Sequence, residues 1–133
     1  YGSKKDTDEK QNWQLIDAEL RLALERYNSI KAPNKDQPIF MDLIIKIYIC
    51  RAYANLKSRK ILTAEKILTS AKSLISMVDR RKVFIEPSWR SQVEVVPLDI
   101  LKQKYLLNKG YLMVALNKDQ DACKHFTQCM RTG

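Results

Sequence analysis

The stretch KYLLNKGYLMVALNKDQDACKHFTQCM, residues 104–130, holds two amphipathic segments separated by the polar turn Asn117-Lys118-Asp119. Apolar and small residues recur in it at steps of three and four, which is the period of a helix with one buried face. Gly110 lies inside the first segment, where glycine costs a helix about 0.5–1 kcal/mol relative to alanine. A close approach of two helices would compensate for that cost. We therefore expect Gly110 to face Ala122 across a helical hairpin.

The same period runs through most of the chain and predicts an all-α protein. It indicates helices over residues 12–31, 39–56, 61–78, 97–116 and 119–131. Short polar turns join the second helix to the third and the fourth to the fifth, so we expect two antiparallel hairpins, at 39–78 and 97–131.

The segments between these helices carry turn and loop residues. Residues 32–38 contain two prolines and predict a loop. Residues 79–97 lose the helical period, and we expect an ordered insertion that packs back on the helices, with an extended piece at 93–96. Residues 1–11 are charged and without period, which predicts a flexible lead-in whose first three residues resemble a tag remnant. A single domain over 12–133 follows.

Composition bounds the class of protein. With 133 residues, of which 45% are hydrophobic, the chain is long enough for one domain with a core. An odd number of cysteines, three, without paired spacing favours a reducing compartment. No run approaches the roughly 18–20 uncharged apolar residues of a membrane span. We expect a fragment of a larger intracellular protein, cytoplasmic or alternatively nuclear, and no membrane span.

The charge is concentrated in one part of the chain. The formal net charge is +9, and residues 57–82 carry eight basic against two acidic side chains. Such an excess attracts acidic protein, nucleic acid or an anionic surface, although a solvated helix face that keeps a domain in solution has the same composition.

The second hairpin resembles the tetratricopeptide repeat, a 34-residue helix-turn-helix unit with small and large residues at fixed places. The places that match its pattern are Gly110, Leu116, Ala122, Phe126 and Cys129. The tryptophan, the tyrosine and the turn glycine of the pattern are replaced here by Leu106, Met113 and Asn117.

The first hairpin follows the same template less closely. Its small residue in the first helix is Cys50 or Ala52, and Tyr53 is its aromatic residue. The places after the turn are taken by Ala64, Leu68 and Ala71. Leu56 and Ala64 are eight residues apart against six from Leu116 to Ala122, which predicts a two-residue insertion in this turn. The resemblance thus implies a degenerate array of about five helices, with helix 12–31 as an unpaired or capping helix.

The resemblance implies a module that binds a partner protein in a helical groove. The expected occupant is an acidic or amphipathic segment, and a homodimer is a further alternative. The predicted binding residues project beside the packing stripe of the first helix of each hairpin: Lys46, Arg51, Lys104, Asn108 and Tyr111.

The alternative hypothesis is nucleic-acid binding through residues 57–90, where cations interleave with aromatic rings. Its candidate residues are Lys57, Arg59, Lys60, Arg80, Arg81, Lys82, Trp89 and Arg90. No phosphate-binding loop, nucleophile motif or metal-ligand spacing is found, and the single histidine, His125, lies on a helix beside Phe126. We therefore expect no enzymatic activity, no cofactor and no metal.

Overall fold

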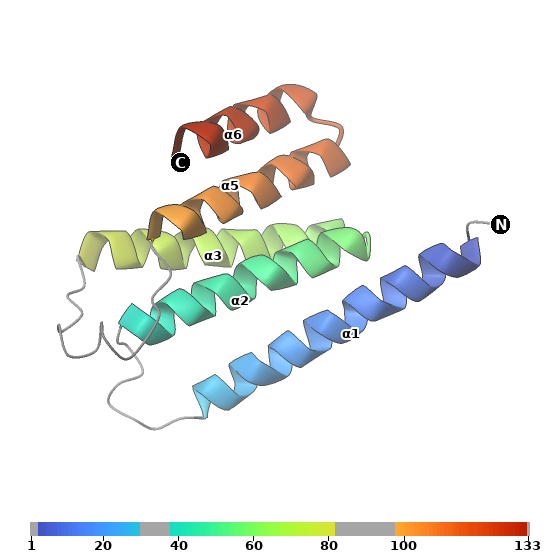
Figure 1. Ribbon diagram of the computed structural model, residues 1–133, viewed down its shortest axis with the longest axis horizontal. Coiled ribbons are helices and arrows are strands. Elements are labelled where there is room, and N and C mark those ends of the chain that lie inside the picture. Colours follow the sequence, from blue (N-terminus) through green and yellow to red (C-terminus); the bar gives the residue numbers. More distant parts are fainter. Residues whose placement is uncertain (1–2, 30–37, 82–97, 133) are drawn as a thin grey trace.

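A computed structural model describes residues 3–29, 38–81 and 98–132 of the chain, and it confirms the all-α class (Figure 1). The helices within these residues are α1 (Ser3–Asn28), α2 (Pro38–Lys57), α3 (Ile61–Arg81), α5 (Leu98–Ala115) and α6 (Asp119–Thr132). The last four agree with the predicted helices to within a few residues. None of the helices in these ranges combines the length and the apolar character that a bilayer crossing requires.

The first helix begins earlier than the sequence pattern predicts. It starts at Ser3 rather than near residue 12, so the predicted start of this helix is wrong. Residues 3–11 have no apolar period, but they contain neither glycine nor proline and include good helix formers such as lysine, glutamate and glutamine. They extend the helix beyond the part that has an apolar period.

The helices form two hairpins and one added helix (Figure 1). The first hairpin consists of α2 and α3, and the second consists of α5 and α6. The α5 helix packs against both α2 and α3, so it joins the second hairpin to the first. Among the described helices, α1 packs against α2 alone, on the opposite side of the array.

The core lies between the hairpins. Ile67 and Leu68 of α3 pack with Leu112 and Met113 of α5 and with Ala122 of α6. A second cluster joins α2 and α3 to α5 through residues that include Ile45, Ile49, Ala71, Ile75 and Leu101. The α2 helix is therefore buried on more than one side, as its apolar composition predicts.

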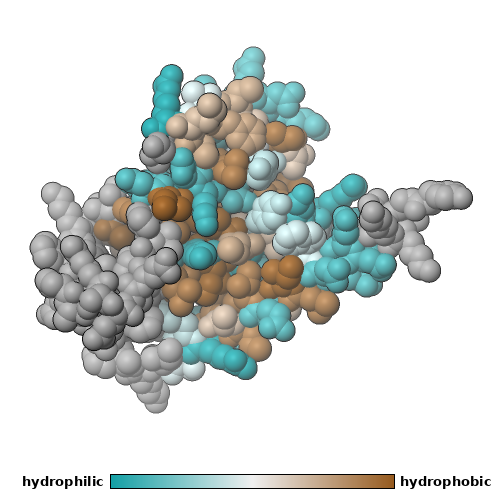
Figure 2. Space-filling view, viewed as in Figure 1, coloured by the Kyte–Doolittle hydropathy of each residue, from teal (hydrophilic) through white to brown (hydrophobic). Residues whose placement is uncertain are grey.

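The surface reflects this arrangement. Figure 2 shows apolar residues gathered over the middle of the array, around α2, and hydrophilic residues over the N-terminal part of α1. The described side chains from Asp8 to Asn12 are exposed apart from the half-buried Lys10, which agrees with the lack of an apolar period there.

The two hairpin turns have the same backbone structure. In the first turn, Lys60 N donates to Asn55 O at 2.8 Å and Arg59 N donates to Leu56 O at 3.1 Å. The second turn repeats both bonds, from Lys118 N to Met113 O at 2.8 Å and from Asn117 N to Val114 O at 3.0 Å. Both turns are Schellman closures of a helix C-terminus. Arg59 and Asn117 are the left-handed residues, with φ of 62° and 60°.

These bonds define one constant shift along the chain between the hairpins, which we call the repeat shift. It takes Lys60 to Lys118 and, in the same step, Leu56 to Val114 and Ser58 to Leu116. The two-residue insertion predicted in the first turn is therefore wrong. The difference in spacing arose from matching Leu56 to Leu116.

The repeat shift also settles the small residue of the first hairpin. It places Ala52, rather than Cys50, at the position of Gly110. Ala52 is fully buried, whereas Cys50 is exposed.

The small residue of the second hairpin faces a large one. The atoms nearest to a Cβ built on Gly110 all belong to the ring of Phe126, with Cδ1 at 2.6 Å and Cζ at 2.7 Å. Ala122, which was expected opposite Gly110, packs instead with Leu112 and Met113 in the core. The glycine thus accommodates an aromatic ring one helical turn beyond the predicted contact.

Part of the predicted insertion belongs to α3, which continues to Arg81. The remainder of that prediction, including the extended piece at 93–96, lies outside the described residues.

Candidate functional site

The candidate site is a cleft between the C-terminal turns of α2 and α5. It encloses about 310 Å³ and is lined by Tyr53, Leu56, Lys57, Tyr111 and Ala115. The repeat shift takes Tyr53 to Tyr111, so the two tyrosines occupy equivalent positions in the two hairpins. Because α2 and α5 lie side by side, the repeat brings both tyrosines to one surface.

Aromatic rings form a continuous row, of which Tyr53 and Tyr111 line the cleft. The ring of Trp13 on α1 meets that of Tyr53 edge to face, with centroids 5.2 Å apart. The Tyr53 and Tyr111 centroids are 6.3 Å apart, and those of Tyr111 and Phe126 are 5.7 Å apart. These separations fall in the range of favourable ring contacts. The row crosses four helices, and Tyr111 within it remains 41% exposed.

A cation borders the aromatic row. Lys57 Nζ lies 5.5 Å from the centroid of the Tyr53 ring, within the range of a cation–π contact. Lys57 is exposed, as are Arg59 and Lys60 in the turn that follows. The α2 end of the cleft is therefore positively charged beside apolar lining, a combination that suits a ligand with acidic and apolar groups.

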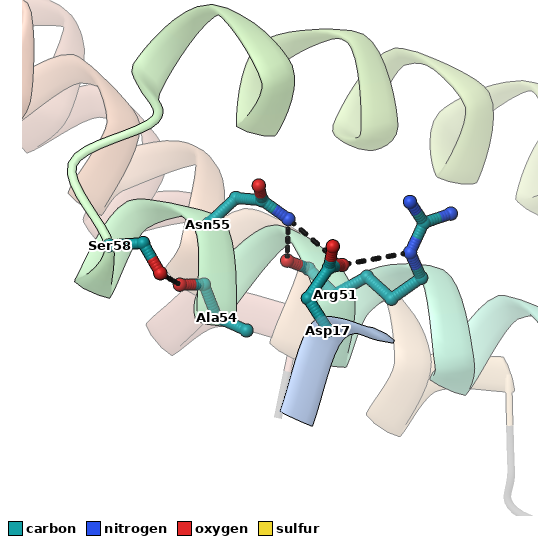
Figure 3. A network of polar contacts seen from close by, with 5 residues as sticks. All are labelled: Asp17, Arg51, Ala54, Asn55 and Ser58. Carbon is teal, nitrogen blue, oxygen red and sulfur yellow. Dashed lines mark hydrogen bonds and ion pairs between the residues drawn. The ribbon is translucent and has the colours of Figure 1, made fainter. Parts of the chain in front are cut away.

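A polar network attaches α1 to this side of the molecule (Figure 3). Asp17 Oδ1 accepts hydrogen bonds from Arg51 Nε and from Asn55 Nδ2, both at 3.0 Å. The side chains of Asp17 and Arg51 are only 16% and 15% exposed, so the ion pair is mostly shielded from water. Since Asp17 lies one helical turn after Trp13, the network also positions the first ring of the aromatic row.

The predicted binding residues do not lie together: some are exposed, one is held in an ion pair and one is buried. Tyr111 lines the cleft, and Lys104 is exposed on the same helix. Lys46 is exposed on α2, whereas Arg51 is held by Asp17. Asn108 is 6% exposed, so it does not project beside the packing stripe as expected.

The amide of Asn108 is only half satisfied. Its Nδ2 donates to Lys104 O at 2.8 Å, while its Oδ1 is buried and has no partner among the described residues. An unpaired buried acceptor destabilises a fold by about 1–3 kcal/mol.

Sequence reasoning missed Leu56 and Ala115 as members of the cleft and Trp13 as the first ring of the aromatic row, and it assigned Lys57 to the nucleic-acid hypothesis. The signal that could have found the cleft is the repeat shift, which aligns Tyr53 with Tyr111. The assumed insertion in the first turn concealed that alignment.

The nucleic-acid candidates are described only in part. Lys57, Arg59 and Lys60 lie exposed at the turn between α2 and α3. Arg80 and Arg81 belong to the last turn of α3, and their side chains are not described. The other three candidates, Lys82, Trp89 and Arg90, lie outside the described residues.

Groups with acid–base or metal-binding chemistry are scattered. Burial lowers the pKa of His125, and the nearby Lys109 lowers it further, while Asp121 acts in the opposite direction. Cys129 Sγ donates to Gln103 O at 3.3 Å, which ties α6 to α5. Within the described ranges, no three or more histidine, cysteine or acidic side chains converge as a metal ion would require.

Comparisons of the chain with protein-family models, with curated proteins and with solved structures found no match. The geometry of the cleft therefore carries the functional argument.

Proposed function

We propose that this domain is a non-enzymatic interaction module, of the tetratricopeptide-like type, that binds an acidic and apolar segment of a partner protein in the cleft between α2 and α5. The observation that supports the proposal most directly is the pair of equivalent tyrosines, Tyr53 and Tyr111, which line the cleft beside Lys57. Tyrosine offers a large apolar area with two rotatable bonds, so its ordering on binding costs little entropy.

Charge selects among segments that could enter the cleft. An acidic group near Lys57 gains electrostatic energy beside a ring of low polarity, and the net charge of +9 steers acidic partners toward the domain. An apolar residue of the same segment would fill the space between Tyr111 and Ala115.

A direct test uses a fluorescein-labelled short peptide that has leucine and phenylalanine at its centre and glutamates on both sides. Anisotropy should report saturable binding, and Lys57→Glu or Tyr111→Ala should weaken it about tenfold, equivalent to about 1.4 kcal/mol. Lys66→Glu, at an exposed position of α3, is the matched control for the charge change.

The same peptide with lysine in place of glutamate should bind more weakly to the parent. Circular dichroism confirms that each variant is folded. Equal affinity of the parent and the Lys57→Glu and Tyr111→Ala variants for the peptide would reject the cleft.

A second candidate is nucleic acid, favoured by the exposed cations Lys57, Arg59 and Lys60 at one turn. Its test is the affinity for a labelled single-stranded oligonucleotide at low and at physiological salt, since phosphate contacts lose affinity steeply with salt. Binding that persists in Arg59→Glu with Lys60→Glu, or no binding at either salt concentration, would exclude this turn as a nucleic-acid site.

A further inference from the structure

The repeat shift identifies which face of the second hairpin corresponds to a buried face of the first. On the first hairpin, α5 covers a surface that includes Ile49 of α2 and Leu68 of α3. Ile49 is 3% exposed and Leu68 is fully buried. A helix laid across both helices of the hairpin is thus what closes this face.

The equivalent face of the second hairpin is open. Leu107 corresponds to Ile49 and is 37% exposed, and Phe126 corresponds to Leu68 and is only partly buried. Val114, which corresponds to the partly buried Leu56, is 50% exposed. Among the described helices, α5 is the one that runs alongside α6, and Ala122 of α6 reaches the core cluster that holds Leu68 of α3. We call Leu107, Val114, Phe126 and Met130 the end face.

At one position the end face carries an apolar residue where the first hairpin has a charged one. Met130, which is 80% exposed, stands at the position of Lys72 in the first hairpin. A methionine there exposes apolar surface beside Phe126, whereas a lysine at the edge of a filled groove can extend into water. Because of this difference, the apolar surface of the second hairpin extends beyond the area that α5 covers on the first hairpin.

We propose that the end face binds an amphipathic helix of a partner protein, placed as α5 is placed on the first hairpin. The interface inside this chain specifies the shape, because α5 presents Leu101, Tyr105 and Leu112 to the first hairpin, at helical spacing. The partner helix presents apolar residues at the same period.

The net charge of the second hairpin indicates which polar residues the partner helix should carry. Residues 98–132 carry six basic and three acidic side chains, so a helix with acidic residues beside its apolar stripe complements this hairpin. A second copy of the chain does not, because two such hairpins and two net charges of +9 would approach each other.

The end face adjoins the cleft but shares no lining residue with it. Its four residues do not line the cleft, which is formed by the side of α5 that carries Tyr111 and Ala115. Phe126 does contact the Tyr111 ring, so the variants that test the end face are at Met130 and Leu107, neither of which lines the cleft.

The test uses a labelled synthetic peptide with the sequence of α5, residues 98–115, carrying Lys102→Glu, Lys104→Glu and Lys109→Glu. Isothermal titration or anisotropy should show binding at a ratio of one to one. Met130→Glu and Leu107→Glu should each weaken it at least about tenfold, because either places a charge on the end face. Leu62→Glu, at a 73% exposed position on α3, is the matched control.

The exposure of Met130 keeps the test informative even where Leu107→Glu affects folding. Binding that Met130→Glu leaves unchanged, or no binding of the peptide, would overturn the proposal. Sedimentation velocity of the parent adds a further outcome: self-association abolished by Met130→Glu would assign the end face to a second copy and overturn the partner helix. Lys57→Glu, which tests the cleft, should not affect this peptide.

Discussion

The ring of Phe126 occupies the space that the Cβ of any residue other than glycine would fill at position 110. The equivalent positions in the first hairpin hold Ala52 and Leu68, which are fully buried in one core cluster, so a residue with a methyl group is paired there with a smaller partner than phenylalanine. The two hairpins thus satisfy the same close approach of helices with opposite distributions of volume.

This pairing predicts what happens when the residues of the first hairpin are introduced at the equivalent positions of the second hairpin. Gly110→Ala should destabilise the domain by about 1–3 kcal/mol, because the added methyl group overlaps the ring. Adding Phe126→Leu, which copies the first hairpin, should recover a large part of that loss even though Phe126→Leu alone destabilises. Urea unfolding of the parent, both single variants and the double variant measures the coupling. Additive effects would contradict the direct contact.

The left-handed residue of the first turn is a second point where the hairpins differ. Arg59 has φ of 62° at the position where the second hairpin has Asn117, and asparagine tolerates this region better than arginine. Arg59→Asn should therefore stabilise the domain by about 0.5–1 kcal/mol. The reciprocal Asn117→Arg should destabilise by a similar amount. Thermal unfolding checks both, and a lower melting temperature for Arg59→Asn would contradict the prediction.

The attachment of α1 depends on Asp17, whose Oδ1 accepts from both Arg51 and Asn55. Asp17→Ala should destabilise the domain by about 1–3 kcal/mol, because it leaves a shielded guanidinium without its carboxylate and removes one of the two acceptors of Asn55 Nδ2. Glu19→Ala, at an exposed position of the same helix, should change stability by less than about 0.5 kcal/mol. Trp13 fluorescence in a Trp89→Phe background reports whether α1 separates from Tyr53. Equal stability of Asp17→Ala and Glu19→Ala would show that the network does not hold α1.

Asp42 predicts a dependence of stability on pH. The carboxyl lies buried on α2, 8% exposed, and burial raises its pKa from 3.8 to about 6. Because the folded state binds the proton more tightly, the favourable contribution is complete below about pH 4 and is lost as pH rises through about 6. At pH 7 the buried carboxylate therefore costs at most about 3 kcal/mol.

Asp42→Asn removes that titration. Relative to the parent, the variant should gain stability as pH rises from about 4 to about 7, as measured by urea unfolding at both values. Asp8→Asn, at an exposed position of α1, controls for a general change in charge. A difference between parent and Asp42→Asn that is the same at both pH values would contradict the assignment.

Local pattern was sufficient to predict where most helices lie. A helix that buries one face has apolar residues at helical period in its own sequence. The bounds of α2, α3, α5 and α6 were therefore predicted to within a few residues. The all-α class and the two hairpins followed from the same signal. The start of α1 was predicted too late because residues 3–11 are helical without carrying an apolar period.

Tertiary structure alone decided which residues of different helices contact one another. That Phe126 rather than Ala122 fills the space over Gly110, that Asn108 is buried, and that Tyr53 lies beside Tyr111 are facts about packing between helices. Period predicts which side of a helix is apolar, but the register and rotation of one helix against another depend on contacts between residues far apart in the chain. The sequence thus determined the helices and their hairpins, while the cleft, its aromatic row and the open end face arose only when the two hairpins packed together.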